Sequence, residues 1–94
     1  MEIIWRRSAL LDLEAIYEFI AEDNPEAAQR VAAAIEAAVD PLADHPELGR
    51  AGRVEGTREL VVADLPYIIA YRVREETVRI LAVVHTSRQW PRRF

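Results

Sequence analysis

The spacing of apolar residues changes once along this chain, near Thr57, and this change constrains the fold more than any other feature. Before it, apolar side chains recur every three or four residues, which is the period of an amphipathic helix. After it, β-branched and aromatic residues come in runs of strand length. The order predicts a helical first half that packs on one side of a small antiparallel sheet made by the second half.

Two helices joined by a tight turn are predicted in the first half. The first follows a short β-prone opening at residues 2–5, and Ser8 is expected to cap it. Asn24-Pro25 should end this helix and start the next, because Asn caps helices well and Pro fits the first helical position. The second helix is expected to break near Asp40, where prolines crowd its end.

Three strands are predicted after a loop from Asp44 to Gly56 that holds all three glycines. Their apolar runs lie at 60–62, 67–73 and 78–84, and the polar or Pro-bearing connections are short enough for hairpins. Apolar residues on both faces indicate that the helices cover one face and that the other is at least partly covered. The expected fold class is α+β: a short N-terminal strand, an α-helical hairpin and a three-stranded antiparallel β-meander.

Length and composition predict a single domain, residues 1–94, since separate cores usually need about 50 residues or more each. So small a domain has a thin stability margin, and we expect it to work in complex with a partner. The absence of cysteine excludes disulfides and thiolate zinc sites. No apolar run approaches the ~20 residues that cross a bilayer, and the first residues lack the order of a signal peptide. A cytoplasmic protein without membrane contact is expected.

Charge is distributed unevenly along the chain. Residues 1–48 hold three Arg against eleven acidic residues, whereas residues 49–94 hold nine Arg against five. There is no Lys, so every cation is a planar guanidinium suited to carboxylate or phosphate. Arg74 and Arg79 are interpreted as solvated strand ends, where ion pairs stabilise by about 0 to 1 kcal/mol. Arg58, Arg88 and the tail 90–94 are interpreted as partner contacts, because Arg and Trp dominate contact energies between proteins.

Several short blocks of residues are spaced along nearly the whole chain. In order, they are Trp5, Asp12-Leu13 with Ile16, Asn24-Pro25 with Ala27-Ala28 and Arg30-Val31, Leu42 with Pro46 and Gly49-Arg50, 56–61, 66–69, 71–73, and His85 with 88–91. This pattern resembles the RelE/ParE toxin superfamily, most closely its ParE branch. The resemblance implies the toxin of a type II toxin-antitoxin pair, bound in a hetero-oligomer by a cognate antitoxin, ParD-like or other, whose C-terminal segment wraps it.

The resemblance also implies two classes of target. ParE-like toxins are associated with poisoning DNA gyrase, and RelE-like toxins with cutting mRNA on the ribosome. Under the first reading, the target-binding residues are assigned to the basic and aromatic tail: Arg88, Trp90, Arg92, Arg93 and Phe94.

A second apolar stripe on the first predicted helix is a candidate antitoxin surface. Leu11, Ala15 and Phe19 follow one another at four-residue steps, away from the stripe that should face the sheet. Either Phe19 folds onto the second helix, or the stripe receives a helix of the antitoxin. Arg58 and Arg72 are added to the antitoxin-binding set. The acidic row beside the stripe is most simply a solvated face: Glu14, Glu18 and Glu22.

Metal-independent RNA cleavage needs a base, an acid and cations on the phosphate. If the chain is a nuclease, His85 is the candidate base or acid, with Arg58 and Arg88 as phosphate clamps. However, His85 ends an apolar strand, where a hydrogen-bonded structural imidazole is more common, and the lysines and C-terminal Tyr of RelE-like nucleases are missing. We expect a non-catalytic inhibitor. A ribosome-dependent mRNA endonuclease is the alternative, and an inactive partner-binding module is a further one.

No metal and no cofactor are expected. His45 and His85 lie far apart in sequence, and no spacing of His or carboxylates matches a known metal site. The glycines of the central loop do not lie between a strand and a helix as in a phosphate-binding loop, so they are interpreted as turn residues.

Overall fold

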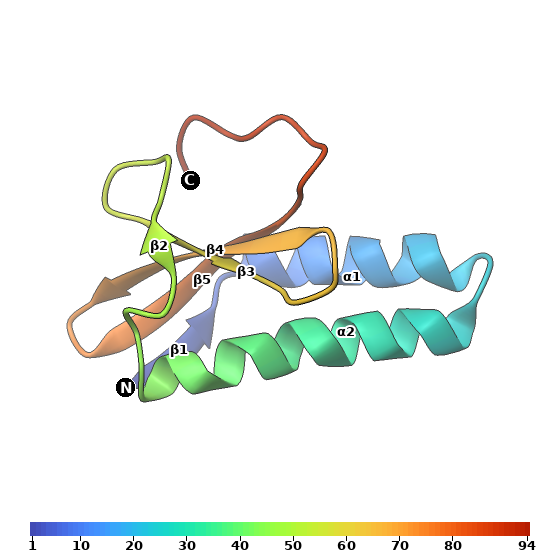
Figure 1. Cartoon of the computed structure of the whole chain (residues 1–94), viewed down its shortest axis with the longest axis horizontal. Helices are drawn as coiled ribbons and strands as arrows, with labels where there is room; N and C mark the ends of the chain where they lie inside the picture. Colours follow the sequence, from blue (N-terminus) through green and yellow to red (C-terminus); the bar gives the residue numbers. More distant parts are fainter.

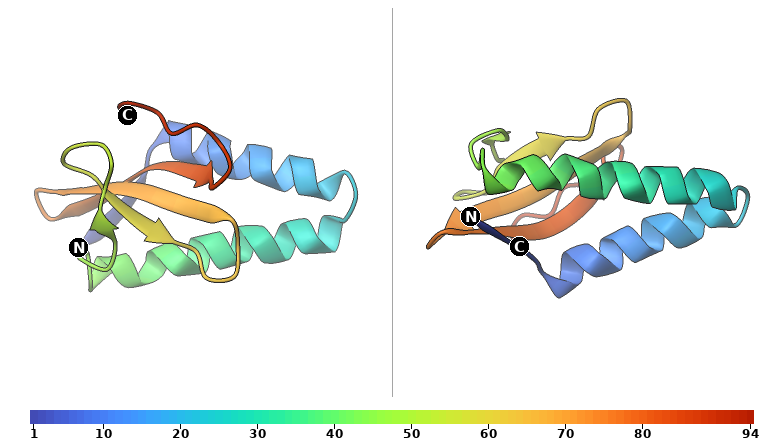
Figure 2. Two further views of the ribbon diagram at one scale, coloured as in Figure 1. Left: turned by 45° about the horizontal axis from the view of Figure 1, so that its top comes forward. Right: turned by 90° about the horizontal axis from the view of Figure 1, so that it is seen from below.

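A helical hairpin packs on one face of a five-stranded sheet in the computed structural model, which describes residues 1–94. The elements follow in the order β1 (Glu2–Trp5), α1 (Arg7–Ala21), α2 (Pro25–Val39), a 3₁₀ turn (Asp40–Ala43), β2 (Arg50–Ala51), β3 (Arg58–Val61), β4 (Tyr67–Arg74) and β5 (Thr77–His85). Figure 1 shows this arrangement, and the right-hand view of Figure 2 shows both helices in front of the sheet. The α+β class predicted from the sequence is confirmed.

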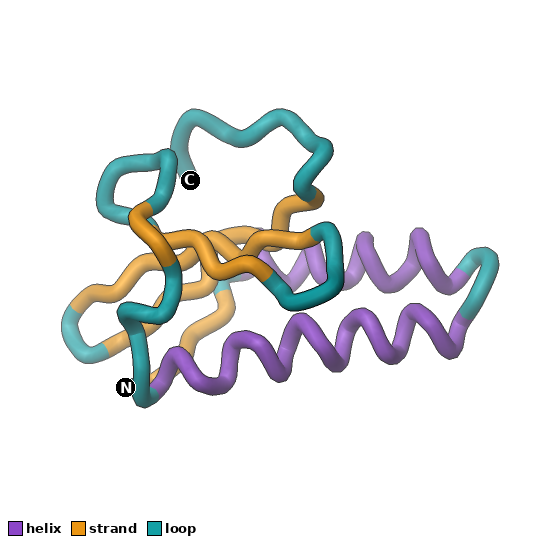
Figure 3. The backbone as a smooth tube through the Cα atoms, viewed as in Figure 1, coloured by secondary structure: helices purple, strands orange, loops and turns teal.

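The strand order across the sheet is β1-β5-β4-β3-β2. The predicted meander is confirmed, because β3, β4 and β5 are antiparallel neighbours. The N-terminal strand β1 joins the same sheet, parallel to β5, from Glu2 opposite Thr77 to Trp5 opposite Ile80. The opposite edge is β2, which falls inside the predicted loop (Figure 3). Only two residues long and flanked by glycines, β2 has no apolar run that a sequence pattern could detect.

The two predicted helix starts have different outcomes. Asn24 does cap α2: its side chain accepts a hydrogen bond from the backbone N–H of Ala27 at 3.0 Å, and Pro25 is the first helical residue. The prediction for Ser8 is wrong, because α1 already begins at Arg7 and the residue before the helix is the extended Arg6. Ser8 instead donates a hydrogen bond across the fold to the carbonyl of Leu81 on β5, at 2.8 Å. The predicted break near Asp40 is confirmed by the 3₁₀ turn.

The core lies between the helices and the inner face of the sheet. Ile35 and Leu42 pack there against Ile69, Tyr71 and Ile80, all without exposed surface. The buried hydroxyl of Tyr71 is satisfied twice, since it donates to the carbonyl of Pro46 (2.6 Å) and accepts from the N–H of Gly49 (2.8 Å). These bonds fix the loop after the helices to the middle of the sheet. Burial raises the pKa of this phenol, and the bond from Gly49 offsets part of the rise.

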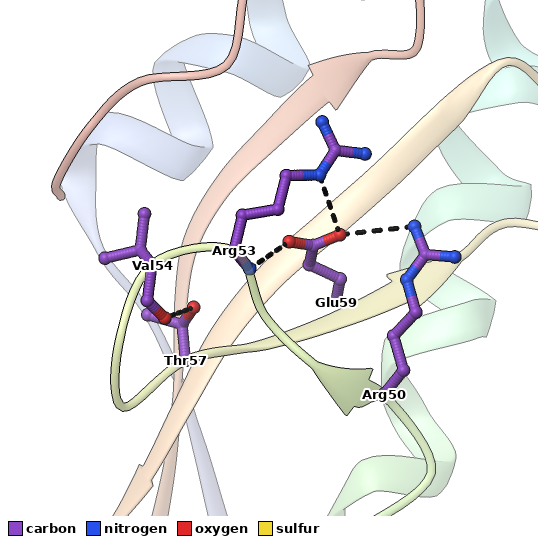
Figure 4. A network of polar contacts seen from close by, with 5 residues as sticks. All are labelled: Arg50, Arg53, Val54, Thr57 and Glu59. Atoms are coloured by element: carbon purple, nitrogen blue, oxygen red, sulfur yellow. Dashed lines mark hydrogen bonds and ion pairs between the residues drawn. The ribbon is translucent and has the colours of Figure 1, made fainter.

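The outer face of the sheet is partly covered by the loop after β2 and by the C-terminal tail. Glu59, only 2% exposed, accepts a bond from the backbone N–H of Arg53 at 2.7 Å and pairs with the guanidinium groups of Arg50 (3.2 Å) and Arg53 (3.6 Å; Figure 4). The tail turns back toward this loop (Figure 1), so that the Arg53 guanidinium lies 4.3 Å from the centre of the Trp90 ring. The expected covering of the second face is thus supplied by the chain itself.

Neither helix is both long and apolar enough to cross a bilayer.

Candidate functional site: a groove between α1 and β5

A mostly apolar groove lies between α1 and the second half of β5. It encloses about 540 Å³, and ten of its sixteen lining residues are hydrophobic. The helix contributes one wall, β5 the floor, and the C-terminal tail the other wall. The lining includes Ser8, Asp12, Ala15 and Phe19 from α1, Leu81, Val83 and His85 from β5, and Arg88 and Phe94 from the tail.

The groove exists because β1 is shorter than β5. It pairs with β5 only over residues 77–80, after which the chain turns into α1. The remainder of β5, Leu81–His85, therefore has no neighbouring strand along the edge opposite β4. Side chains of α1 take over part of that edge: Ser8 donates to the carbonyl of Leu81, and the Asp12 carboxylate accepts from the N–H of Val83 at 3.0 Å. An open strand edge of this kind is a template for pairing with another chain.

Asp12 is the acidic group in the groove wall. Burial raises the pKa of its carboxyl, and the bond from Val83 and the nearby charge of Arg88 each offset part of the rise. Sequence reasoning did not single out this residue as part of a site. The available signal was a polar pair, Ser8 and Asp12, four residues apart on a face of the helix that is otherwise apolar.

The second stripe of α1 lies exposed at the rim of the groove. Phe19 is 75% exposed and Leu11 50%, and Ala15 is also exposed. The interpretation in which Phe19 folds onto α2 is therefore wrong. Leu10, which the helical spacing assigns to the stripe that should face the sheet, is also 50% exposed, so that assignment is wrong. The acidic row beside the stripe is exposed and makes no ion pair within 4.0 Å, as expected for a solvated face.

The nuclease candidates do not all converge on one site, because His85 and Arg88 both line the groove whereas Arg58 lies on β3. The Nδ1 atom of His85 accepts from the Ser87 N–H at 3.0 Å and lies 2.7 Å from the Ser87 hydroxyl, and the ring packs edge-on against Tyr67 at 5.3 Å. Arg58 donates to the carbonyl of Gly49 at 2.7 Å. His85 is opposite Tyr67 on β4 whereas Arg58 is opposite Tyr71, four residues away, which is about 13 Å along a strand.

The predicted antitoxin-binding residues fall into three places. Leu11, Ala15 and Phe19 lie together on α1. Arg58 lies on the inner side of β3 with its guanidinium bonded to the loop before β2. Arg72 lies half-buried on the outer face of β4.

The predicted target-binding residues all lie in the tail. Arg92 and Arg93 are exposed, while Trp90 and Phe94 are half-buried and meet edge-on with ring centres 6.3 Å apart. Arg88 and Phe94 also line the groove, so the tail contributes to both candidate surfaces. No three His, Asp or Glu side chains gather in a way that would hold a metal ion.

Comparison with known proteins identifies the family. Residues 3–90 match the family model described as the ParE toxin of the type II toxin-antitoxin system parDE. The chain is 52% identical over 89 residues to the putative toxin Y4kP of Sinorhizobium fredii (strain NBRC 101917 / NGR234), covering 95% of this chain and 92% of that protein. It is 41% identical over 87 residues to the toxin RelE2 of Caulobacter vibrioides, covering 93% and 97%.

A solved structure supports the same assignment. A chain from the chromosomal ParDE toxin-antitoxin system of P. aeruginosa superimposes with a TM-score of 0.83 at 30% identity, covering 93% of this chain and 97% of that chain. The family match and the fold therefore agree over nearly the full length. The chain belongs to the ParE family of type II toxin-antitoxin toxins, within the RelE/ParE superfamily.

Proposed function

We propose that this toxin acts in the cytoplasm by inhibiting DNA gyrase, and that a cognate antitoxin silences it by occupying the groove between α1 and β5. The single observation that carries the antitoxin part is the exposed apolar stripe of α1 beside an open strand edge. The similar P. aeruginosa structure, described as a ParDE system, supports an antitoxin as the partner.

The groove offers an antitoxin segment two kinds of contact. Phe19 and Leu11 present apolar surface that is costly to leave in water, at about 25 cal/mol for each Å² that a partner would cover. The edge of β5 beyond Val83 offers backbone groups to an extended segment, in the manner of strand addition. An amphipathic antitoxin segment lying along α1 would use both, and it would also contact Arg88 and Phe94 of the tail.

The C-terminal tail is the proposed contact with gyrase. Arg92 and Arg93 are exposed and make no ion pair within 4.0 Å. Trp90 contacts the Arg53 guanidinium and the edge of Phe94, and its buried indole N–H has no hydrogen-bond partner. Such an unsatisfied donor costs about 1–3 kcal/mol. A gyrase surface that accepts this N–H would therefore compete well for Trp90.

The contacts of His85 and Arg58 favour a non-catalytic inhibitor over a nuclease. One imidazole nitrogen is engaged by Ser87, and the Arg58 guanidinium is bonded to backbone carbonyls of the neighbouring loop. General acid-base catalysis needs these groups free and close to one reacting phosphate. This arrangement supports gyrase as the target, with mRNA cleavage as the outcome to be excluded by experiment.

Expression of the toxin without its antitoxin tests the proposal. We expect DNA breaks and an SOS response with intact mRNA, and we expect His85→Ala to remain as toxic as the unmodified chain. Fragmented mRNA with unaltered DNA, abolished by His85→Ala in a folded protein, would support the ribosome-dependent nuclease instead. Absence of any growth defect from a folded chain would support an inactive partner-binding module.

A further inference from the structure

Three arginines share one end of the outer face of the sheet. Arg72 on β4 lies directly opposite Arg79 on β5, and Arg74 lies two residues further along β4, opposite Thr77. Since alternate residues of a strand point to the same face, the three side chains leave the same face of the sheet near the β4–β5 turn. We call this group the hairpin arginine patch: Arg72, Arg74 and Arg79.

The patch makes no ion pair within the chain. The ion pairs within 4.0 Å are those of Glu59 with Arg50 and Arg53, and none involves the patch. Glu2 on β1 points to the same face, opposite Thr77, but does not come within ion-pair distance of Arg79. Like charges directly opposite each other on antiparallel strands are destabilising. The isolated chain therefore bears an electrostatic cost that an anion bound at the patch would remove.

The same face of the sheet also shows how a carboxylate relieves such a cost. Glu59 is opposite Ala70, so it points to the face that Arg72 shares. There its carboxylate lies between the guanidinium groups of Arg50 and Arg53. Figure 4 shows this two-arginine arrangement. The pair Arg72 and Arg79 has the cations of such an arrangement without the carboxylate.

We propose that the hairpin arginine patch binds an acidic segment of a protein partner, with a carboxylate placed between Arg72 and Arg79. Guanidinium groups bind carboxylates through two parallel hydrogen bonds, which gives this contact direction as well as charge. Ile4, opposite Arg79 on β1, is 36% exposed on the same face. An apolar side chain next to arginines is typical of protein interfaces, where Arg is enriched and the centre is apolar.

The overall charge of the molecule favours a peptide over a nucleic acid. The chain has a formal net charge of -4, and the negative field around the molecule would repel a long phosphate backbone. A short acidic segment needs only local complementarity. The patch lies at the opposite end of β5 from the groove, so the two surfaces can be occupied together. The proposal therefore does not depend on whether gyrase is the target.

Titration of the full-length, ¹⁵N-labelled chain with a hexaglutamate peptide tests the proposal. We expect amide shifts centred on residues 72–79 and a dissociation constant about tenfold weaker in the double variant Arg72→Glu/Arg79→Glu. The matched control is Arg7→Glu/Arg30→Glu, which makes the same change in net charge at exposed positions on the helices and should alter the affinity less than twofold. Circular dichroism confirms that each variant is folded.

Four results would overturn the proposal. They are no measurable binding of the peptide, shifts centred on the tail, an equal loss of affinity in the control variant, or tighter binding of a single-stranded 12-nucleotide DNA at residues 72–79. The last result would mean that the patch binds phosphates.

Discussion

Asp12 on α1 accepts the backbone N–H of Val83 on β5 at 3.0 Å, and the carboxylate thereby fills a position that a neighbouring strand would otherwise take. Together with the bond from Ser8 to Leu81, it fixes the first helix against a strand edge that β1 leaves open. This contact keeps the exposed stripe of α1 beside the open edge. The groove therefore depends on a link between residues 71 positions apart in sequence.

Replacing Asp12 separates the effects of its hydrogen bond and its charge. Asp12→Ala leaves the Val83 N–H without a partner and should lower the free energy of unfolding by about 1–2 kcal/mol. Asp12→Asn keeps an acceptor oxygen and removes the charge. Because burial raises the folded-state pKa of Asp12 above its ordinary value of 3.8, the unmodified chain loses stability from this group as pH rises from about 3.8 through the folded-state pKa. Urea unfolding at pH 4 and pH 7 should show this loss in the unmodified chain and not in Asp12→Asn. A larger loss in the variant would contradict the assignment.

Phe19 should matter for antitoxin binding and very little for folding. Its side chain is 75% exposed, so Phe19→Ser should change the free energy of unfolding by less than about 0.5 kcal/mol. In the complex its loss should weaken antitoxin binding by about 30-fold, as for a buried interface anchor. Leu48→Ser is the matched control, since Leu48 is 53% exposed outside the groove. Calorimetric titration with the antitoxin measures the affinity of both variants. An equal loss of affinity in Phe19→Ser and Leu48→Ser would exclude α1 as the main contact.

Two glycines should respond differently to substitution by alanine. A Cβ atom at Gly49 would lie 2.7 Å from the ring of Tyr71 and 2.9 Å from the carbonyl oxygen of Glu59, so Gly49→Ala should cost about 2–3 kcal/mol. At Gly56 a Cβ would meet only the Nε atom of Arg72, at an ordinary contact distance of 4.0 Å, so only the positive φ of 80° opposes it, which costs about 1 kcal/mol. Thermal unfolding of the two variants shows which substitution destabilises the chain more. A smaller loss of stability in Gly49→Ala than in Gly56→Ala would mean that Tyr71 does not hold the loop in place.

The β4–β5 turn carries strain that can be removed. Glu75 and Glu76 both have positive φ, 51° and 63°, a conformation that Asn and Gly adopt more easily. Glu75→Asn/Glu76→Gly should therefore raise the free energy of unfolding by about 1–2 kcal/mol, as measured by urea denaturation. No gain in stability would mean that the two glutamates make a compensating contact in solution.

The sequence predicted those elements whose signals are local. Helical periodicity located α1 and α2, and apolar runs located β3, β4 and β5, because each pattern is complete within one segment. Ser8 was assigned wrongly for the same reason. Its position just before the apolar helical pattern is typical of a helix cap, but its hydrogen-bond partner Leu81 lies 73 residues away in the sequence. The parallel pairing of β1 with β5 is equally non-local.

The residues of the candidate site also differ in whether a local pattern predicts them. The stripe of Leu11, Ala15 and Phe19 follows from the helical period alone. The role of Asp12 depends on which edge of β5 is open, and that is a property of the assembled sheet. The opposition of Arg72 and Arg79 depends on the strand register, which shifts between Ala70 and Tyr71. The sequence of β5 alone therefore predicts only a solvated strand end at Arg79.

Inhibition of purified DNA gyrase by the purified toxin is the decisive measurement of the proposed target. The unmodified chain and His85→Ala should inhibit supercoiling equally, and Arg92→Ala/Arg93→Ala should weaken inhibition by about tenfold or more while the fold is retained. Addition of the antitoxin should restore supercoiling. Unimpaired supercoiling at every concentration of a folded toxin, together with ribosome-dependent cleavage of mRNA that His85→Ala abolishes, would contradict gyrase as the target.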